Sequence, residues 1–308
     1  MGPDVEMIPA DETFDGTWPY TPHFFDEAGF RMHYVDEGPR DAAPIVCLHG
    51  EPTWGYLYRR FIPRLVQHGR VIVPDHMGFG KSETPQDRDY SIREHCDNLT
   101  KLLLHLDLRE ITLVMQDWGG PIGAAFALQH PGRIKRICAM NTIVGGQPPA
   151  GVPSVVDHHW FKWVQTDAFE PTLSQLGSTI LSVMKRIGFE RTTQVDETWV
   201  RAYAAPFPNV EECRGALQFP RNIAHPETAK FMQEVASLPG AQEALRSKPA
   251  MYVHGEEDRA IPVEFAVGSF RNTFPEGPVV TLPGVGHFLQ EDAPEAVTAL
   301  IEQFIQMT

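Results

Sequence analysis

Six short apolar runs, separated by longer segments with helical periodicity, constrain the fold of this chain more than any other feature. The runs are PIVCLHG, RVIVPDHMG, ITLVMQDWGG, RICAMN, AMYVHGEED and VVTLPGVGH, which begin at residues 44, 70, 111, 136, 250 and 279. Such runs between helices are typical of parallel strands that are buried on both faces. The pattern therefore predicts an α/β protein with a mostly parallel central sheet flanked by helices.

Two of the predicted helices begin with the pattern of a capping box, in which a capping side chain precedes a glutamate by three positions. Ser91 and Glu94 form this pattern in YSIREHCDNLTKLLLHL, and Asp292 and Glu295 form it in EDAPEAVTALIEQFI. We expect a helix to start at each place.

The alternation of strands and helices lapses between RICAMN and AMYVHGEED. Residues 147–225 are rich in Trp, Phe and Pro and contain helical stretches without a clear buried strand. We interpret this segment as a helical cap inserted into a core domain formed by residues 1–146 and 226–308. The stretch GGQPPAGVP at 145–153 has the composition of a hinge into the cap.

Charge and composition exclude several classes of partner. The chain has 308 residues and a formal net charge of −14, which repels nucleic acid and anionic membranes. Its apolar runs are all shorter than the about 18 residues of a membrane span. These properties favour a small-molecule partner, with no nucleic acid and no membrane.

The four cysteines and the N-terminal stretch both suggest a cytoplasmic protein. Cys47, Cys96, Cys138 and Cys213 have no CxxC spacing, so we expect buried thiols in a reducing compartment and no disulfides. The stretch MGPDVEMIPADETF has no apolar segment of the kind that a secretion signal requires.

The stretch LVMQDWGGPIG places a charge, Asp117, directly after a predicted buried strand. Asp is a favoured N-cap, so Asp117 could simply start the following helix. A strand, a sharp turn and a helix with small residues also describe a nucleophile elbow, in which the turn exposes its central side chain. The strict GxSxG pattern is absent, because Met115 replaces its first glycine and Asp117 replaces its serine. This stretch by itself leaves the two interpretations evenly balanced.

Two further strand ends supply partners for such a nucleophile. His287 follows the last predicted strand in PGVGHFLQED, where a general base is needed, and Asp258 follows the preceding strand in HGEEDRAIP. Asp258 could orient the imidazole, although an aspartate in a turn is often structural. The order nucleophile, acid, histidine is the order of the α/β-hydrolase fold.

With these residues assembled, the chain resembles the haloalkane dehalogenases of the α/β-hydrolase fold. The resemblance implies that Asp117 is the nucleophile, His287 the base and Asp258 the acid, and that the backbone N–H groups of Glu51 and Trp118 form the oxyanion hole. It also implies cleavage of a carbon–halogen bond through an alkyl–aspartate ester, giving an alcohol, a halide and a proton, without a cofactor or metal. The motifs that carry it are HGEPTWGYLYRR, DHMGFGKS, QDWGG, AYAAPFP and GHFLQE.

A halide that leaves into a dry pocket needs hydrogen-bond donors, and an indole N–H donates without offering a lone pair. Trp118, next to the nucleophile, is the first predicted donor. Some relatives supply the second donor from an Asn after HG, but here Glu51 occupies that position. The aromatic spacing of HHWFKWVQTD, compared with the family, favours Trp163 as the second donor, and Trp160 remains the alternative.

Comparison with the same family also indicates which residue is the acid of the triad. Some relatives carry it after the strand that corresponds to RICAMN, but this chain has Asn141 there, so Asp258 is the predicted acid.

Three other functions compete with this interpretation. Epoxide hydrolases use two lid tyrosines, whereas the predicted cap contains only Tyr203, and fluoroacetate dehalogenases use arginines near the nucleophile that DWGGPIG lacks. A binding protein that keeps the fold without catalysis would be expected to lose a member of the triad. We therefore expect a monomeric haloalkane dehalogenase whose partners are a haloalkane, water and a halide ion.

Overall fold

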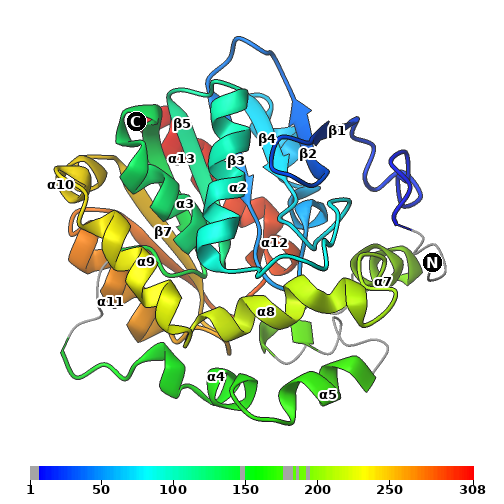
Figure 1. Ribbon diagram of the computed structural model, residues 1–308. Coiled ribbons are helices and arrows are strands. Elements are labelled where there is room, and N and C mark those ends of the chain that lie inside the picture. The colour runs from blue at the N-terminus through cyan, green and yellow to red at the C-terminus, as the bar shows by residue number, and fades with distance from the viewer. Residues whose placement is uncertain (1–6, 146–149, 176–182, 185–186, 192–194) are drawn as a thin grey trace.

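The computed structural model describes residues 7–145, 150–175, 183–184, 187–191 and 195–308 (Figure 1). In this part of the chain eight strands form one sheet in the order β1-β2-β4-β3-β5-β6-β7-β8. The pairings from β4 to β8 are parallel, and only β1–β2 and β2–β4 are antiparallel. This confirms the predicted fold class. The strands span Pro22–Phe25 (β1), Met32–Glu37 (β2), Pro44–Leu48 (β3), Arg70–Pro74 (β4), Ile111–Gln116 (β5), Ile134–Met140 (β6), Ala250–Gly255 (β7) and Val279–Leu282 (β8).

The six predicted runs correspond to β3–β8, but the sequence analysis missed two strands and was wrong about the burial of one. The N-terminal strands β1 and β2 were not predicted, because a four-residue strand and an isolated six-residue strand give little periodicity. The prediction that every run is buried on both faces fails for β8, whose side chains are partly exposed. β8 lies at the edge of the sheet and pairs only with β7, so less of its surface is covered.

Helices cover both faces of the sheet. Figure 1 shows α2 (Ile92–His105) and α3 (Gly119–Gln129) in front of the strands and α13 (Pro294–Met307) behind them. Two further helices, α9 (Pro226–Ala236) and α10 (Ala241–Arg246), pack against α3. The remaining core helices are α1 (Ile62–Leu65), which packs against α13, α11 (Val263–Thr273), which packs against β7, and α12 (Leu289–Asp292), which adjoins α13.

One of the two predicted capping sites is confirmed. Ser91 is the N-cap of α2, and its side chain accepts a hydrogen bond from the Glu94 N–H. Asp292 does not cap α13, which begins at Pro294 after the N-cap Ala293. The Asp292 carboxylate instead accepts hydrogen bonds from backbone N–H groups elsewhere in the fold, so a local pattern was overridden by tertiary contacts.

Between β6 and β7 the described residues contain helices and no strand, as expected for a cap. Those that precede α9 and α10 are η3 (Val155–Asp157), α4 (His159–Val164), α5 (Phe169–Gln175), α7 (Glu197–Ala204), η5 (Glu211–Cys213) and α8 (Arg214–Asn222). Figure 1 shows α4, α5, α7 and α8 along one side of the sheet. The division into 1–146 and 226–308 against 147–225 stays a prediction, since the cap start and part of the hinge lie outside the described residues.

A hydrogen bond from the cap reaches a buried ion pair in the core. The Arg59 guanidinium donates two hydrogen bonds to Glu291, and the Tyr203 hydroxyl on α7 donates a third at 2.5 Å. Burial raises the pKa of Glu291, but the charge and hydrogen bonds of Arg59 outweigh burial and hold that pKa below its usual value. The hydroxyl of Tyr203 is therefore occupied by a structural hydrogen bond to Glu291.

The cysteines are free thiols, in agreement with the prediction. Cys47, Cys96 and Cys138 are buried, whereas Cys213 is only half-buried, so burial was wrongly predicted for that residue. Within the described residues, no helix combines the length and the apolar character needed to cross a membrane.

Candidate active site

Asp117 occupies a sharp turn between β5 and α3. Its φ angle of 50° lies in the left-handed region, which non-glycine residues rarely adopt, so the turn is strained. The N-cap of α3 is Trp118, and the side chain of Asp117 accepts no hydrogen bond from the helix that follows. The N-cap interpretation of Asp117 is therefore excluded, and the strand–turn–helix geometry of an elbow is present.

Glycines make this turn possible because the backbone is tightly surrounded. A Cβ atom at Gly119 would lie 2.4 Å from the carbonyl oxygen of Leu48, and one at Gly120 would lie 1.8 Å from Oγ1 of Thr142. Both distances are far below van der Waals contact, so larger residues would push α3 away from the sheet. The small residues of DWGGPIG thus have a steric cause.

The loop after β3 approaches Asp117 from the opposite side. The backbone N–H of Glu51 donates to Oδ1 of Asp117 at 2.7 Å. A Cβ at Gly50 would lie 2.0 Å from the same oxygen, so only glycine allows this approach. The side chain of Glu51 is buried, and burial, followed by the charge of Asp117, raises its pKa well above the usual value. Glu51 therefore contributes a backbone donor, and its buried surroundings disfavour a charge on its side chain.

His287 lies in the loop between β8 and α12, with its ring between two carboxylates. Its Nε2 atom is 3.2 Å from Oδ2 of Asp117, and its Nδ1 atom is 2.9 Å from Oδ2 of Asp258. The other oxygen of Asp258 accepts hydrogen bonds from the N–H groups of Ala260 and Ile261 at 2.7 and 3.0 Å. The structure thus brings together the three residues that the sequence proposed as a triad.

The protonation of His287 depends on competing causes. Burial lowers the pKa of His287, but the charge of Asp258 and the hydrogen bond to Asp117 outweigh burial and raise the pKa to about 10. The free site therefore favours an imidazolium that is paired with both carboxylates.

Asn141, which the sequence excluded as the acid, connects the loops of the site. Its side-chain amide donates to the carbonyl of Gly286 at 2.7 Å and accepts from the N–H of Gly255 at 2.8 Å. Its backbone carbonyl accepts from the N–H of Asp117 at 3.1 Å. Asn141 thus fixes the turn of the nucleophile relative to the loops that carry His287 and Asp258.

Sequence reasoning missed two contacts of His287. The side-chain amide of Gln116 lies 3.1 Å from Nε2 of the ring and 3.2 Å from the His287 carbonyl. On the other side, Gly188 of the cap packs against the backbone of His287, and its carbonyl accepts from the N–H of Phe288 at 3.1 Å. A polar residue at the end of a buried strand was the available signal for Gln116, whereas Gly188 gave none.

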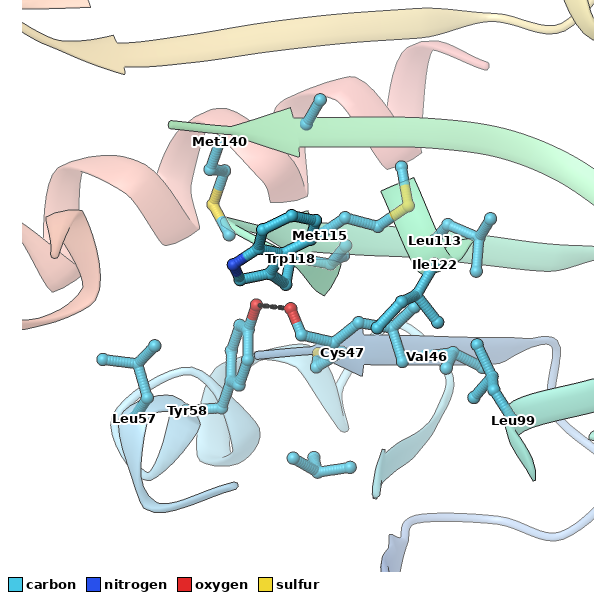
Figure 2. Close-up of a cluster of buried hydrophobic side chains, with 14 of the residues drawn as sticks. Val46, Cys47, Leu57, Tyr58, Leu99, Leu113, Met115, Trp118, Ile122 and Met140 are labelled. Carbon is cyan, nitrogen blue, oxygen red and sulfur yellow. Dashed lines mark hydrogen bonds between the residues drawn. The ribbon is translucent and has the colours of Figure 1, made fainter. Parts of the chain in front are cut away.

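Trp118 lies under the cap, beside the elbow. Its side chain is only 6% exposed, and Phe219 of α8 stacks on it with ring centroids 5.8 Å apart. Figure 2 shows Trp118 within the cluster of buried side chains that includes Tyr58, Met115 and Met140. An indole N–H can donate a hydrogen bond to an anion without offering a lone pair.

Trp160 and Trp163 both lie on α4, which packs against α8. Trp160 is 2% exposed and packs in the cap core, whereas Trp163 is half-buried. The Trp163 ring lies 5.5 Å from that of Trp160 and 5.2 Å from that of Phe169. The position of Trp163 beside Trp118 stays a prediction.

In the residues that the structure describes, no group of three or more His, Cys, Asp or Glu side chains is arranged to hold a metal ion.

Comparison with known proteins identifies the family. The sequence model of the α/β hydrolase fold matches residues 43–294. A haloalkane dehalogenase of Psychrobacter cryohalolentis is 36% identical, covering 93% of this chain and 92% of its own. A cis-3-alkyl-4-alkyloxetan-2-one decarboxylase of Xanthomonas campestris is 31% identical, covering 96% and 98%.

Solved structures resemble this fold closely. The structure of a haloalkane dehalogenase from Paraglaciecola agarilytica, described as tetrameric, superposes with a TM-score of 0.75 at 30% identity. The match covers 96% of this chain and 97% of that one.

Proposed function

Because the chain belongs to the α/β-hydrolase family, among the haloalkane dehalogenases and their relatives, we propose that it hydrolyses carbon–halogen bonds of haloalkanes through an ester on Asp117. The observation that carries the proposal is the position of the Asp117 carboxylate. One of its oxygens accepts from the Glu51 N–H at 2.7 Å, and the other lies 3.2 Å from Nε2 of His287. A nucleophile, a base and an oxyanion donor thus meet at one carboxylate.

The first step is displacement of the halide. Oδ2 of Asp117 attacks the halogen-bearing carbon, while Oδ1 keeps its hydrogen bond from Glu51 and becomes the ester carbonyl. The carbon–halogen electron pair leaves with the halide, which the indole N–H groups of Trp118 and Trp163 receive. A carboxylate that is already ionised needs no base for this attack.

The second step is hydrolysis of the ester. Once the charge of Asp117 is lost in the ester, His287 releases its Nε2 proton to solvent. The neutral ring then takes a proton from water at Nε2, and the hydroxide attacks the carboxyl carbon of Asp117. The charge that develops on Oδ1 is stabilised by the backbone N–H groups of Glu51 and Trp118. The alcohol then leaves with one proton from His287, and the second proton of the water returns His287 to its protonated form as the carboxylate reforms, so one proton is released in each turnover. Asp258 orients the ring through Nδ1.

The proposed reaction requires no cofactor or metal, and its small partners are a haloalkane, water and a halide ion. We propose a cytoplasmic protein with a cap over residues 147–225. A monomer is the simplest assembly, and the relative described as tetrameric supplies the alternative outcome for a light-scattering measurement of mass.

A single turnover in heavy-oxygen water tests the ester directly. The new oxygen enters the carboxyl group of Asp117 if water attacks the ester, and mass spectrometry of the peptide detects it. The Asp117→Ala variant is the control and should bind bromide while releasing none from bromoalkanes. Label that appears in the alcohol and not in Asp117 would contradict the ester mechanism.

Two other activities share parts of this site. Epoxide hydrolysis requires a free cap tyrosine, whereas Tyr203 is buried and donates its hydroxyl to Glu291 at 2.5 Å. Decarboxylation of an oxetan-2-one is the named activity of the Xanthomonas relative. The haloalkane dehalogenase of Psychrobacter cryohalolentis is 36% identical to this chain and the decarboxylase 31%, which favours halide release. Parallel assays of bromide release from bromoalkanes and carbon dioxide release from a cis-3,4-dialkyl oxetan-2-one separate these functions, and a binding protein would give neither product.

A further inference from the structure

Gln116, the last residue of β5, contacts the proposed base but has no task in the two steps above. Its side chain is fully buried and reaches His287, which is 171 positions further along the chain. The amide nitrogen of Gln116 lies 3.1 Å from the ring Nε2 of His287 and 3.2 Å from the backbone carbonyl of the same residue.

The carbonyl of His287 determines how the amide is turned. A carbonyl oxygen can only accept hydrogen bonds, so the NH₂ group of Gln116 must face it. The reverse orientation would place two oxygens in contact at this point. Oε1 of Gln116 is consequently buried without a hydrogen-bond partner in the described part of the chain. The second N–H of the amide is then available to the ring nitrogen 3.1 Å away.

An N–H group aimed at Nε2 favours the form of the ring that has a lone pair there. The imidazolium carries a proton at Nε2 and would place one donor against another. We propose that Gln116 is a positioning residue for ester hydrolysis, whose amide stabilises neutral His287 with Nε2 unprotonated and ready to accept a proton from water. This inference rests on the proposed function and adds a determinant of its pH dependence.

The surroundings of His287 explain why such a residue is needed. Asp258 and Asp117 favour the imidazolium, whereas burial opposes it. When Asp117 becomes an ester its charge disappears, so only Asp258 still favours a protonated ring. Burial lowers the pKa of His254, which lies 4.0 Å from Asp258, and raises the pKa of Glu51, so burial disfavours a charge on either side chain. In the ester, the amide of Gln116 is thus the polar group that opposes Asp258 at the ring.

The same contact assists recovery of the base. After His287 has taken a proton from water, its Nε2–H faces the N–H of Gln116, and this arrangement is unfavourable. The proton therefore leaves more readily to the alcohol, which completes hydrolysis of the ester.

The test replaces the amide with a side chain of similar length that has no N–H, Gln116→Met. The matched control is Gln290→Met, which removes another fully buried amide, on α12. Rapid mixing with a bromoalkane measures the bromide burst, which reports alkylation, and alcohol formation, which reports ester hydrolysis, between pH 6 and pH 10.

We expect Gln116→Met to retain the burst and to raise the apparent pKa of ester hydrolysis by about half a unit to one unit, the effect of losing one hydrogen bond. Hydrolysis at pH 7 should therefore slow about three- to tenfold and recover at high pH. The control should keep the wild-type profile. Hydrolysis that is equally slow at every pH, an unchanged profile or a lower apparent pKa would each overturn the proposal.

A second measurement does not depend on turnover. Asp117→Asn imitates the uncharged ester, and NMR titration of the His287 ring in this background gives its pKa with and without Gln116→Met. The pKa should be higher without the amide. If the wild-type protein releases no bromide but this difference appears, the proposed function fails and the inference about Gln116 stands. If bromide is released but the pKa difference is absent, the proposed function stands and the inference about Gln116 fails.

Discussion

The Asp258→Asn substitution exchanges one oxygen of the proposed acid for an amide nitrogen beside His287. In the protein, one Asp258 oxygen accepts from the N–H groups of Ala260 and Ile261, and the other lies 2.9 Å from Nδ1 of the ring. Asparagine can satisfy the two backbone donors only with its oxygen. Its NH₂ group must then face Nδ1, where the wild-type protein has an acceptor.

The size of the effect follows from these contacts. Two backbone hydrogen bonds, each worth about 0.5–1.5 kcal/mol, hold the asparagine oxygen in place, so the amide does not turn over easily. Facing a donor, Nδ1 must act as an acceptor, and the neutral ring then carries its proton on Nε2. A ring in this tautomer cannot accept a proton from water, and the corresponding loss in a serine-protease triad is about 10⁴-fold. We expect ester hydrolysis by Asp258→Asn to fall about 10³- to 10⁴-fold.

Burst kinetics measure this loss. Alkylation needs no base, so Asp258→Asn should release about one bromide per active site and then stop, and mass spectrometry should detect the alkyl adduct on Asp117. Glu257→Gln, which makes the same charge change at an exposed position of the same turn, should turn over like the wild-type protein. Steady turnover by Asp258→Asn near the wild-type rate would refute the tautomer argument.

Three other substitutions test separate parts of the site. Trp163→Phe should weaken bromide binding about ten- to a hundredfold through loss of one charge-assisted hydrogen bond, as measured by fluorescence quenching, whereas Trp160→Phe should change it little. The opposite result would make Trp160 the second donor. Gly50→Ala places a methyl group 2.0 Å from Oδ1 of Asp117 and should lower kcat about 10²- to 10³-fold while circular dichroism stays unchanged. Glu291→Gln should cost about 3–5 kcal/mol in denaturant unfolding, because a buried guanidinium loses its charged partner. The folded-state pKa of Glu291 is lowered. The stabilisation by the Arg59–Glu291 ion pair is therefore present above about pH 4 and is lost as the pH falls through the folded-state pKa. An unfolding free energy of Glu291→Gln that equals that of the wild-type protein at pH 7 would contradict this account.

The sequence by itself determined the central parallel strands and the residues at their ends. A strand that is buried on both faces must be apolar over most of its length, so a polar residue at its end is conspicuous, as Asp117 and Asp258 are. Carboxyl ends of parallel strands share one edge of the sheet, and side chains there can meet despite large separations in the chain. The meeting of Asp117, His287 and Asp258 was predictable for this reason.

Tertiary structure decided the features that depend on which surfaces meet. β1 and β2 are short segments that form strands because β1 pairs with β2 and β2 pairs with β4. Asp292 accepts hydrogen bonds from N–H groups of other segments and does not cap α13. The contact of Gln116 with His287 is of the same kind. The orientation of the Gln116 amide is set by a carbonyl 171 positions away. Local propensity cannot specify that orientation, because it depends on hydrogen bonds between groups that become neighbours only in the folded chain.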